Sequence, residues 1–197
     1  NGAAIYNLNL INASFPEKIS LSREISEILD IFINKISKKY KSKCKFIKNL
    51  TTDKQSQIFG QSKEKVKLAM NREYSIPLLY DGSKTEKVDL IKSINYAGLS
   101  LHEGGRVINL CDKISKSQAM KHVVKIFKKI SKEELITIGV GDNFNDLDML
   151  KNSDIPCLVF NDKFTMEKIN IDNCLVSKNP APEGWEEVVK LALDKIK

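Results

Sequence analysis

The 197-residue sequence has few of the residues from which zinc sites or disulfide frameworks are built. Its four cysteines stand singly, without a Cys-x-x-Cys pair, and only two histidines could join them. Isolated cysteines of this kind indicate buried free thiols in a reducing compartment. No stretch approaches the roughly 18 apolar residues of a membrane helix, and the first residues, NGAAIYNLNL, lack the basic start of a signal peptide. We therefore expect a folded, cytoplasmic protein.

The charge balance is basic, but it does not select a partner by itself. Lysine and arginine (32) exceed aspartate and glutamate (25), which gives a formal charge of +7 and could attract nucleic acid, a membrane surface or a small anion. The densest basic run, SKKYKSKCKF at residues 37–46, contains no recognisable nucleic-acid-binding motif. It favours a solvated helix end that leads into an edge strand. We expect neither nucleic acid nor a membrane as partner.

Hydrophobic periodicity divides the chain into two styles. Residues 18–110 alternate strands, helices and turns and predict an α+β unit. Its expected helices cover residues 19–40 and 85–96, with two more begun by caps at Thr52 and Ser62, the first of which Gly60 ends; its strands are CKFIKNL, IPLLY and a hairpin around Gly104 and Gly105.

From residue 111 onward, the strands LITIGV, IPCLVF and CLVS alternate with helices expected at residues 116–130, near 164–169 and from Glu183. Trp185 is expected in the core. This alternation is typical of a parallel sheet covered on both faces. We predict an α/β core from residues 1–17 and 111–197, into which the α+β unit of residues 18–110 is inserted.

A polar cluster follows the strand LITIGV in the stretch GDNFNDLDML, residues 141–150. Ligands of open α/β sheets bind at the carboxyl ends of the strands, so this is where a site is expected. Asp142, Asn145 and Asp146 offer the hard oxygens that magnesium prefers. The alternative is that Asp142 and Asn143 only cap the next helix. Asp148 is expected in the first turn of that helix, where the helix dipole favours a carboxylate.

The stretch GDNFNDLDML resembles the fourth motif of the haloacid dehalogenase superfamily, Gly-Asp-x-x-Asn-Asp, whose acidic residues help to hold the magnesium ion of a phosphatase. The resemblance assigns Asp142 and Asp146 to Mg²⁺. The superfamily's third motif is a lysine near a helix start; in DKISKSQAM, Ser115 and Gln118 form a capping box that places Lys116 there. We favour Lys116 over Lys113 as the catalytic lysine that neutralises the phosphate.

Further segments, among them NGAAIY, REYSIPLL, GGRVINL and PAPEGW, are similar to mannosyl-3-phosphoglycerate phosphatases and their glucosyl relatives along nearly the whole chain. This resemblance implies a Rossmann-like core with an inserted α+β cap, and a small-molecule sugar phosphate as substrate. Arginine forks match carboxylates and phosphates, and a glutamate accepts from sugar hydroxyls. The expected substrate-binding residues are Arg72, Glu73, Arg106, Asn145 and Asn1. The alternatives are that Arg72 only ends its helix and that Arg106 only lies on an edge strand.

The superfamily's nucleophile, the first aspartate of Asp-x-Asp-x-Thr or Asp-x-Asp-x-Val, has no counterpart in this sequence, where Asp-x-Asp occurs only as Asp146-Leu147-Asp148. NGAAIY matches the part of the family that follows its second motif. We therefore expect an N-terminal segment of about fifty residues to be missing, and this chain alone to be inactive. Two alternatives stay open: a catalytically inactive relative that binds a sugar phosphate or a protein partner, and a different sugar phosphatase, such as a sucrose-phosphatase-like enzyme.

Overall fold

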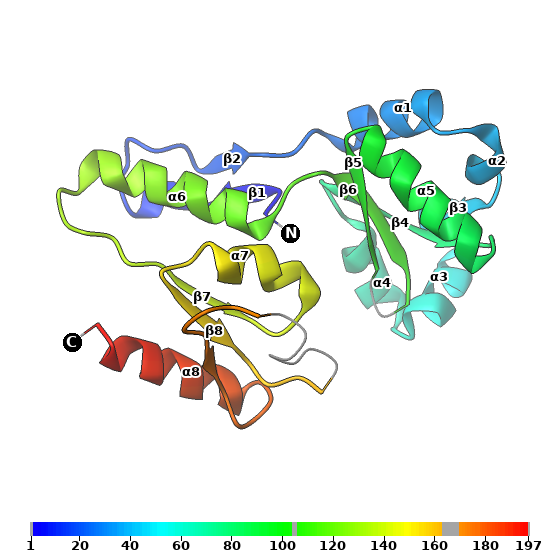
Figure 1. Ribbon diagram of the computed structural model, residues 1–197. Coiled ribbons are helices and arrows are strands. Elements are labelled where there is room, and N and C mark those ends of the chain that lie inside the picture. Colours follow the sequence, from blue (N-terminus) through cyan, green and yellow to red (C-terminus); the bar gives the residue numbers. More distant parts are fainter. Residues whose placement is uncertain (1, 104–105, 163–169, 197) are drawn as a thin grey trace. The chain divides into compact units, whose positions relative to one another are not determined.

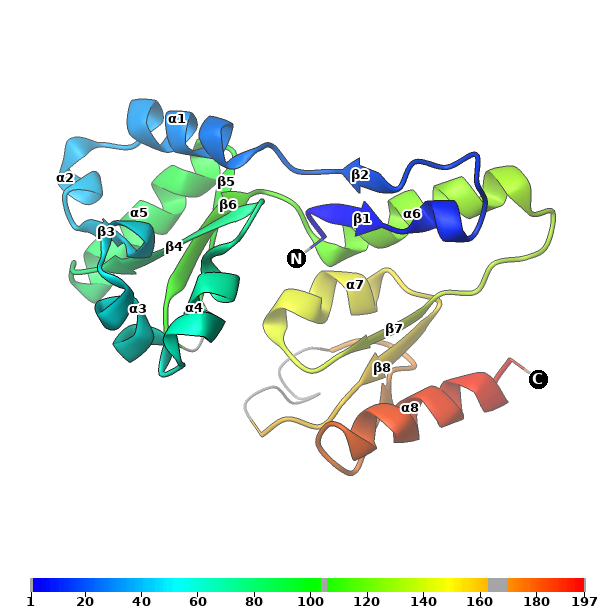
Figure 2. The same cartoon turned by 180° about the vertical axis from the view of Figure 1, so that it is seen from behind.

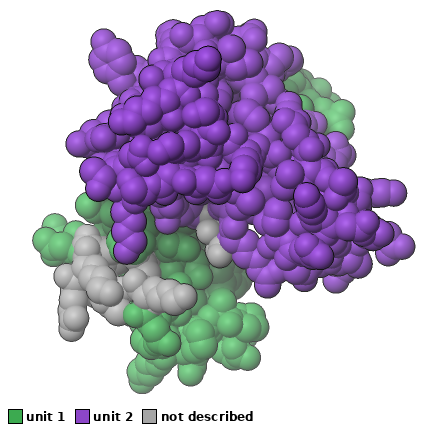
Figure 3. Space-filling model, turned by 90° about the vertical axis from the view of Figure 1, so that its right-hand side faces the viewer, with its two compact units in different colours: residues 1–21, 114–197 green, residues 22–113 purple. Residues whose placement is uncertain are grey.

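The computed structural model describes residues 2–103, 106–162 and 170–196. It divides into two compact units, which are coloured separately in Figure 3. Unit 1 comprises Asn1–Leu21 and Ile114–Lys197, and unit 2 comprises Ser22–Lys113. The boundaries expected from the sequence, after residues 17 and 110, precede these by four and three residues. Among the described residues, none of the helices is both long and apolar enough to cross a bilayer.

Unit 1 contains a parallel sheet of three strands in the order β7-β8-β9, which are Ile138–Gly141, Ile155–Leu158 and Leu175–Val176. Leu150 of helix α7 (Leu147–Lys151) packs with Leu158 on one face, and Val188 of α8 (Glu183–Asp194) packs with Cys157 on the other. Figure 1 shows these helices on opposite sides of the sheet. The predicted parallel α/β sheet is confirmed in this part of the chain.

The rest of unit 1 is a long helix and a small ribbon. Helix α6 spans Lys116–Ile130, the residues predicted for it. The ribbon pairs β1 (Ala4–Tyr6) with β2 (Lys18–Ser20) in antiparallel register, and the turn η1 (Leu8–Leu10) follows β1.

Unit 2 is a four-stranded antiparallel sheet in the order β3-β4-β6-β5 with helices on both sides. Figures 1 and 2 show α5 on one side of the sheet and α3 and α4 on the other. The strands are Cys44–Phe46 (β3), Ser75–Tyr80 (β4), Leu99–Glu103 (β5) and Ile108–Asp112 (β6). The helices are Ile25–Lys35 (α1), Lys38–Lys41 (α2), Thr52–Phe59 (α3), Lys63–Met70 (α4) and Lys84–Tyr96 (α5), with the turn η2 at Ile47–Asn49.

One core fills the space between this sheet and helices α1 and α5. Phe32 of α1, Leu90 of α5, and Leu78, Leu99 and Leu110 of the strands are all buried in it. Successive strand residues point to opposite faces, so the alternate positions, including Asn109 of β6 and His102 of β5, lie on the other face of the sheet. That second face mixes these polar residues with their neighbours Pro77 and Cys111, so polar groups are available on it for a ligand.

The helix predicted over residues 19–40 is wrong at both ends. Ile19 pairs with Ile5 in the β1–β2 ribbon, and α1 begins only at Ile25. At the other end Ile36 adopts an extended backbone, with φ −92° and ψ 134°, yet stays buried in the same core as α1. The apolar residues of a strand, a helix and a loop therefore happen to follow one another at helical spacing, which is why the sequence predicted a single long helix.

Smaller predictions also need correction. Trp185 was expected in the core, but 54% of it is exposed on α8. The cap of α3 is Thr51 rather than Thr52, whereas Gly60 does end this helix, with φ +60°. The capping residue of α4 is Ser62, as predicted. The helix expected near residues 164–169 and the Gly104-Gly105 turn lie outside the described residues.

Candidate active site

The carboxyl end of β7 is shaped by the close approach of Gly141 to Asp146. A Cβ atom at Gly141 would lie 2.3 Å from the Cβ of Asp146, so no larger residue fits there without displacement. The Asp146 carboxylate accepts a hydrogen bond from the backbone N–H of Asp142, with 3.3 Å between nitrogen and Oδ2. The loop after the strand therefore folds back onto a buried acid, since Asp146 is only 3% exposed.

The N-terminus of α6 supplies the basic partner of that acid. Ser115 and Gln118 form the predicted capping box, which fixes the first turn and puts Lys116 at its first position. The Lys116 ammonium donates to Asp146 Oδ1 and forms an ion pair with it. About a third of the Lys116 side chain remains exposed (35%), compared with 5% of the Asp146 side chain. The lysine can therefore contact both the buried acid and a ligand in solvent.

A second contact ties α6 to the motif loop. The Ser115 hydroxyl donates to Asp148 Oδ2 over 2.6 Å. Asp148 lies in the first turn of α7, as predicted, and its carboxylate also accepts from Asn152. Two pairs of side chains thus join the start of α6 to the loop and helix after β7.

Exposed oxygens lie next to the Lys116–Asp146 pair. Asp142, Asn143 and Asn145 are exposed, and Asn161 Nδ2 donates to the Asp142 backbone carbonyl over 2.9 Å. Mg²⁺ usually binds one or two protein carboxylates and completes its shell with water and substrate phosphate oxygens. The exposed Asp142 fits that chemistry, whereas both oxygens of Asp146 already accept from protein groups. Within the described residues, no three histidine, cysteine or acidic side chains form a ready-made metal cluster.

Unit 2 has a cavity of about 460 Å³ lined by two of the predicted substrate residues, Arg72 and Arg106. The Arg72 guanidinium donates to the Ala69 carbonyl (2.7 Å), Ser75 Oγ (3.2 Å) and Asn109 Oδ1 (3.0 Å). Arg106 donates to the Phe59 carbonyl. The two cations are thus held by neutral acceptors, which leaves their charge available to an anion. Glu73 is exposed and does not line this cavity, and Asn1 lies outside the described residues.

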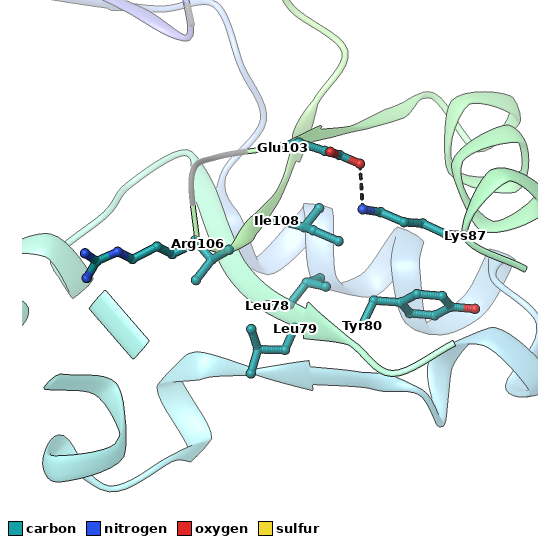
Figure 4. Close-up of a pocket in the computed structure, with 8 residues that line it drawn as sticks. Leu78, Leu79, Tyr80, Lys87, Glu103, Arg106 and Ile108 are labelled. Atoms are coloured by element: carbon teal, nitrogen blue, oxygen red, sulfur yellow. Dashed lines mark ion pairs between the residues drawn. The ribbon is translucent and has the colours of Figure 1, made fainter. Parts of the chain in front are cut away.

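A second cavity of about 260 Å³ adjoins the first at Arg106 and Val107. Figure 4 shows its floor, formed by Leu78 and Ile108, with the Lys87–Glu103 ion pair (2.6 Å) at one side. In this view the Arg106 guanidinium points away from that pair. The Lys87 and Glu103 charges neutralise each other, whereas Arg72 and Arg106 both line the first cavity without an acid, so the first cavity is the better anion site.

Two polar residues on the same face of the sheet were not singled out from the sequence. Asn109 of β6, which holds Arg72, lies directly opposite His102 of β5. Burial lowers the pKa of His102, and its Nε2 has no hydrogen-bond partner among the described residues. The only sequence feature that could have found Asn109 is its place between the apolar neighbours Ile108 and Leu110, and the facing residue depends on strand register.

Comparison with known proteins adds an independent finding. Residues 101–170 match the family model of haloacid dehalogenase-like hydrolases. The chain is 30% identical, over 179 residues, to the glucosyl-3-phosphoglycerate/mannosyl-3-phosphoglycerate phosphatase of Persephonella marina, an alignment that covers 90% of this chain and 65% of that relative. It is 36% identical over 93 residues to the protein of the same name from Methanococcoides burtonii, with 47% of this chain and 34% of the relative covered.

A solved structure from Eubacterium rectale is similar with a TM-score of 0.49 and 15% identity, over 87% of this chain and 66% of that one. The chain therefore spans about two thirds of the first curated relative and about one third of the second.

Proposed function

Because the chain resembles haloacid dehalogenase-like hydrolases and glycosyl-3-phosphoglycerate phosphatases, we propose that it forms part of a cytoplasmic, Mg²⁺-dependent phosphatase. Its substrate is a mannosyl- or glucosyl-3-phosphoglycerate, whose phosphomonoester it hydrolyses to the glycosylglycerate. The observation that carries the proposal is the Lys116–Asp146 pair at the end of β7, with the exposed carboxylate of Asp142 beside it.

The site residues of unit 1 have separate roles in this proposal. Lys116 binds the phosphate, and its ammonium neutralises charge on the phosphoryl oxygens. Asp146 positions that ammonium and holds the loop through the Asp142 N–H. Asp142 would hold the magnesium ion, and Asp146 would complete the surroundings of the ion. Asn145 would contact the substrate. The bound ion would supply positive charge to the transferring phosphoryl group.

The attacking group is an aspartate that forms an aspartyl phosphate, which water then hydrolyses. Asp146 and Asp148, the only Asp-x-Asp pair in this sequence, do not fit that role. Asp146 is buried and paired with Lys116, and Asp148 accepts from Ser115. We therefore propose that the nucleophile is not among these 197 residues and that the chain alone is inactive.

Unit 2 acts as the cap that recognises the organic part of the substrate. Arg72 and Arg106 line one cavity and together match the glycerate carboxylate or a phosphate. Asn109, which lines the same cavity, offers a hydrogen bond to a sugar hydroxyl, and His102 lies opposite it on the sheet. Glu73 and Asn1 remain proposed substrate contacts.

The test is an assay of phosphate release by the protein isolated from its own cells, with mannosyl-3-phosphoglycerate, glucosyl-3-phosphoglycerate and sucrose phosphate. We expect hydrolysis of one of the first two that EDTA abolishes and Mg²⁺ restores. Removing a preorganised charge partner of this kind lowers turnover about 10²- to 10³-fold, so Lys116→Ala should do so.

Lys113→Ala is the matched control, because Lys113 is an exposed lysine of the same segment. Turnover of sucrose phosphate alone would replace the substrate assignment. Tight binding of the sugar phosphates without any turnover would favour the inactive, ligand-binding relative instead. Equal loss in both lysine variants would remove Lys116 from the reaction.

A further inference from the structure

The chain passes between the two units twice, at Leu21–Ser22 and at Lys113–Ile114. Arg23 lies just inside unit 2 after the first crossing, and Asp112 lies just inside it before the second. These two residues are 89 positions apart in the sequence, yet they form an ion pair. Both ends of unit 2 therefore meet at one pair of side chains.

The pair has the geometry of a fork. Arg23 Nη2 donates to Asp112 Oδ1 over 2.5 Å, and Arg23 Nε donates to Oδ2 over 3.0 Å. The same carboxylate accepts from the backbone N–H of Arg23 (2.8 Å) and of Lys113 (2.8 Å). Burial alone would raise the pKa of Asp112, but the hydrogen bonds from Arg23 and from the Lys113 N–H outweigh it and hold the pKa below its usual value. Such bidentate, charge-assisted contacts are short and directional.

A third segment joins the pair to the body of unit 2. Arg23 Nη2 also donates to the carbonyl of Gly98 over 2.6 Å. Gly98 lies between α5 and β5 with φ +80°, a conformation that glycine adopts without steric strain. Leu99, the next residue, is the register partner of Asp112 in the β5–β6 ladder. The pair is thus fixed to the end of two paired strands.

We propose that the Arg23–Asp112 pair, here called the clasp, fixes the unit 2 end of each chain crossing, at Arg23 and at Asp112, in the rigid body of unit 2. Any motion between the units then occurs outside the clasp, at Leu21 and Ser22 on one side and at Lys113 to Ser115 on the other. The second of these segments ends at the N-cap of α6, directly before Lys116. Arg23 is therefore a positioning residue, which sets where the chain bends next to the phosphate-binding lysine.

The alternative is that the Arg23–Asp112 ion pair only adds to the stability of unit 2. Hydrogen exchange of the intact protein, followed by mass spectrometry, separates the two. Arg23→Met breaks the fork but keeps the Asp112 carboxylate as acceptor for both backbone N–H groups. We expect exchange to become at least tenfold faster in peptides covering residues 21–24 and 112–115 together, with the peptides of β4 and α5 unchanged.

The matched control is Lys43→Met, which breaks the Lys43–Glu86 pair of the same unit. That pair has the same 2.5 Å contact, and the side chain of Lys43 is 35% exposed, compared with 36% for Arg23. Lys43→Met should leave the exchange rates at both crossings unchanged. Arg23→Lys, which retains the charge but not the fork, should give a smaller increase at both crossings.

Faster exchange spread evenly over unit 2, or confined to residues 21–24, would overturn the proposal in favour of a general or local stabilising role. Because the readout requires no substrate, its outcome is independent of the phosphatase assay.

Discussion

Two buried carboxylates, one in each unit, have basic partners and yet differ in almost everything else. Asp146 in unit 1 is 3% exposed and Asp112 in unit 2 is 8% exposed. Asp146 is paired with a lysine, whose compact ammonium rotates on a flexible stem. Asp112 is paired with an arginine, whose planar fork contacts both carboxylate oxygens. The first partner can turn toward an incoming anion, whereas the second is held in one geometry.

The surroundings of the two acids differ in the same sense. The same loop as Asp146 carries the exposed residues Asp142 and Asn145, and the Asp142 N–H donates to Asp146. Around Asp112 the additional contacts are backbone groups, the N–H of Arg23 and of Lys113, while the arginine reaches the Gly98 carbonyl. We therefore propose that similarly buried acids have different roles, one in the chemistry of unit 1 and the other in the chain geometry of unit 2. The type of cation and the exposure of neighbouring oxygens distinguish them.

The largest effect on turnover should come from a change at Asp142, the proposed metal ligand in the loop that contains Asp146. In the intact protein, Asp142→Asn should lower phosphate release about 10²- to 10³-fold. The free energy of unfolding should change by less than about 0.5 kcal/mol, because the side chain is exposed. Steady-state kinetics and urea unfolding measure the two. Asp172→Asn, which alters another exposed acid of unit 1, is the control. Undiminished turnover of Asp142→Asn would exclude Asp142 as the metal ligand.

Asp112 should show the opposite profile. Asp112→Ala leaves Arg23 without its partner and removes the acceptor of two backbone N–H groups, so we expect a loss of about 3 kcal/mol in the free energy of unfolding. Asp53→Ala breaks the exposed Asp53–Lys63 pair of the same unit and should cost less than about 1 kcal/mol. Urea unfolding at pH 7 compares the variants, and equal losses would contradict the contrast between buried and exposed pairs.

The pH dependence of this pair has a definite sign. The pKa of Asp112 is lower in the folded protein than its usual value near 3.9 in the unfolded chain. The stabilisation by the ionised carboxylate is therefore complete above about pH 4 and is lost as the pH falls through the folded pKa. The difference in unfolding free energy between wild type and Asp112→Ala should narrow below pH 4. A difference that stays constant down to pH 2 would show that the charge contributes nothing.

Substitutions at two glycines, one near each acid, should have effects of intermediate size on the free energy of unfolding. In Gly141→Ala the new Cβ would meet the Cβ of Asp146 at 2.3 Å, so we expect a loss of about 2 kcal/mol together with reduced turnover. Near Gly98 the closest atom to a new Cβ is Arg23 Nη2 at 3.7 Å. Gly98→Ala should therefore cost only about 1 kcal/mol, from its φ of +80°. Urea unfolding of both variants tests the order, and a larger loss at Gly98 would reverse it.

Sequence reasoning succeeded where the physical cause is local. The capping box of Ser115 and Gln118 fixes the start of α6 within four residues, and the helix was predicted with the bounds that it has. Likewise Ser62 begins α4 and Gly60 ends α3. The three parallel strands were found because short runs rich in Ile, Leu and Val alternate with helices. These rules need no knowledge of what the segment packs against.

It failed where the cause is distant in the sequence. The pairing of Ile19 with Ile5, which turns the start of an expected helix into a strand, depends on the ribbon partner. Asn109 faces His102 only through the β5–β6 register, and Arg23 meets Asp112 across 89 positions. Trp185 was expected in the core, but the face of α8 that packs on the sheet carries Val188 and Ala192 instead. The Arg23–Asp112 pair therefore could not be predicted from the sequence, whereas the motif around Asp142 could, because its residues are contiguous.

The smallest effects distinguish two serines at the start of α6. Ser115 accepts from the Gln118 N–H (3.2 Å) and donates to Asp148, so Ser115→Ala should lower the free energy of unfolding by about 1 kcal/mol. The Ser117 hydroxyl is buried, and among the described residues it has no hydrogen-bond partner.

An unsatisfied buried hydroxyl costs free energy, so Ser117→Ala should be neutral or stabilising. The sign of the difference between the two variants in urea unfolding is the measurement. If Ser117→Ala destabilises the protein as much as Ser115→Ala, the Ser117 hydroxyl has an acceptor in the intact protein, and the start of α6 holds one more bound group than the described residues supply.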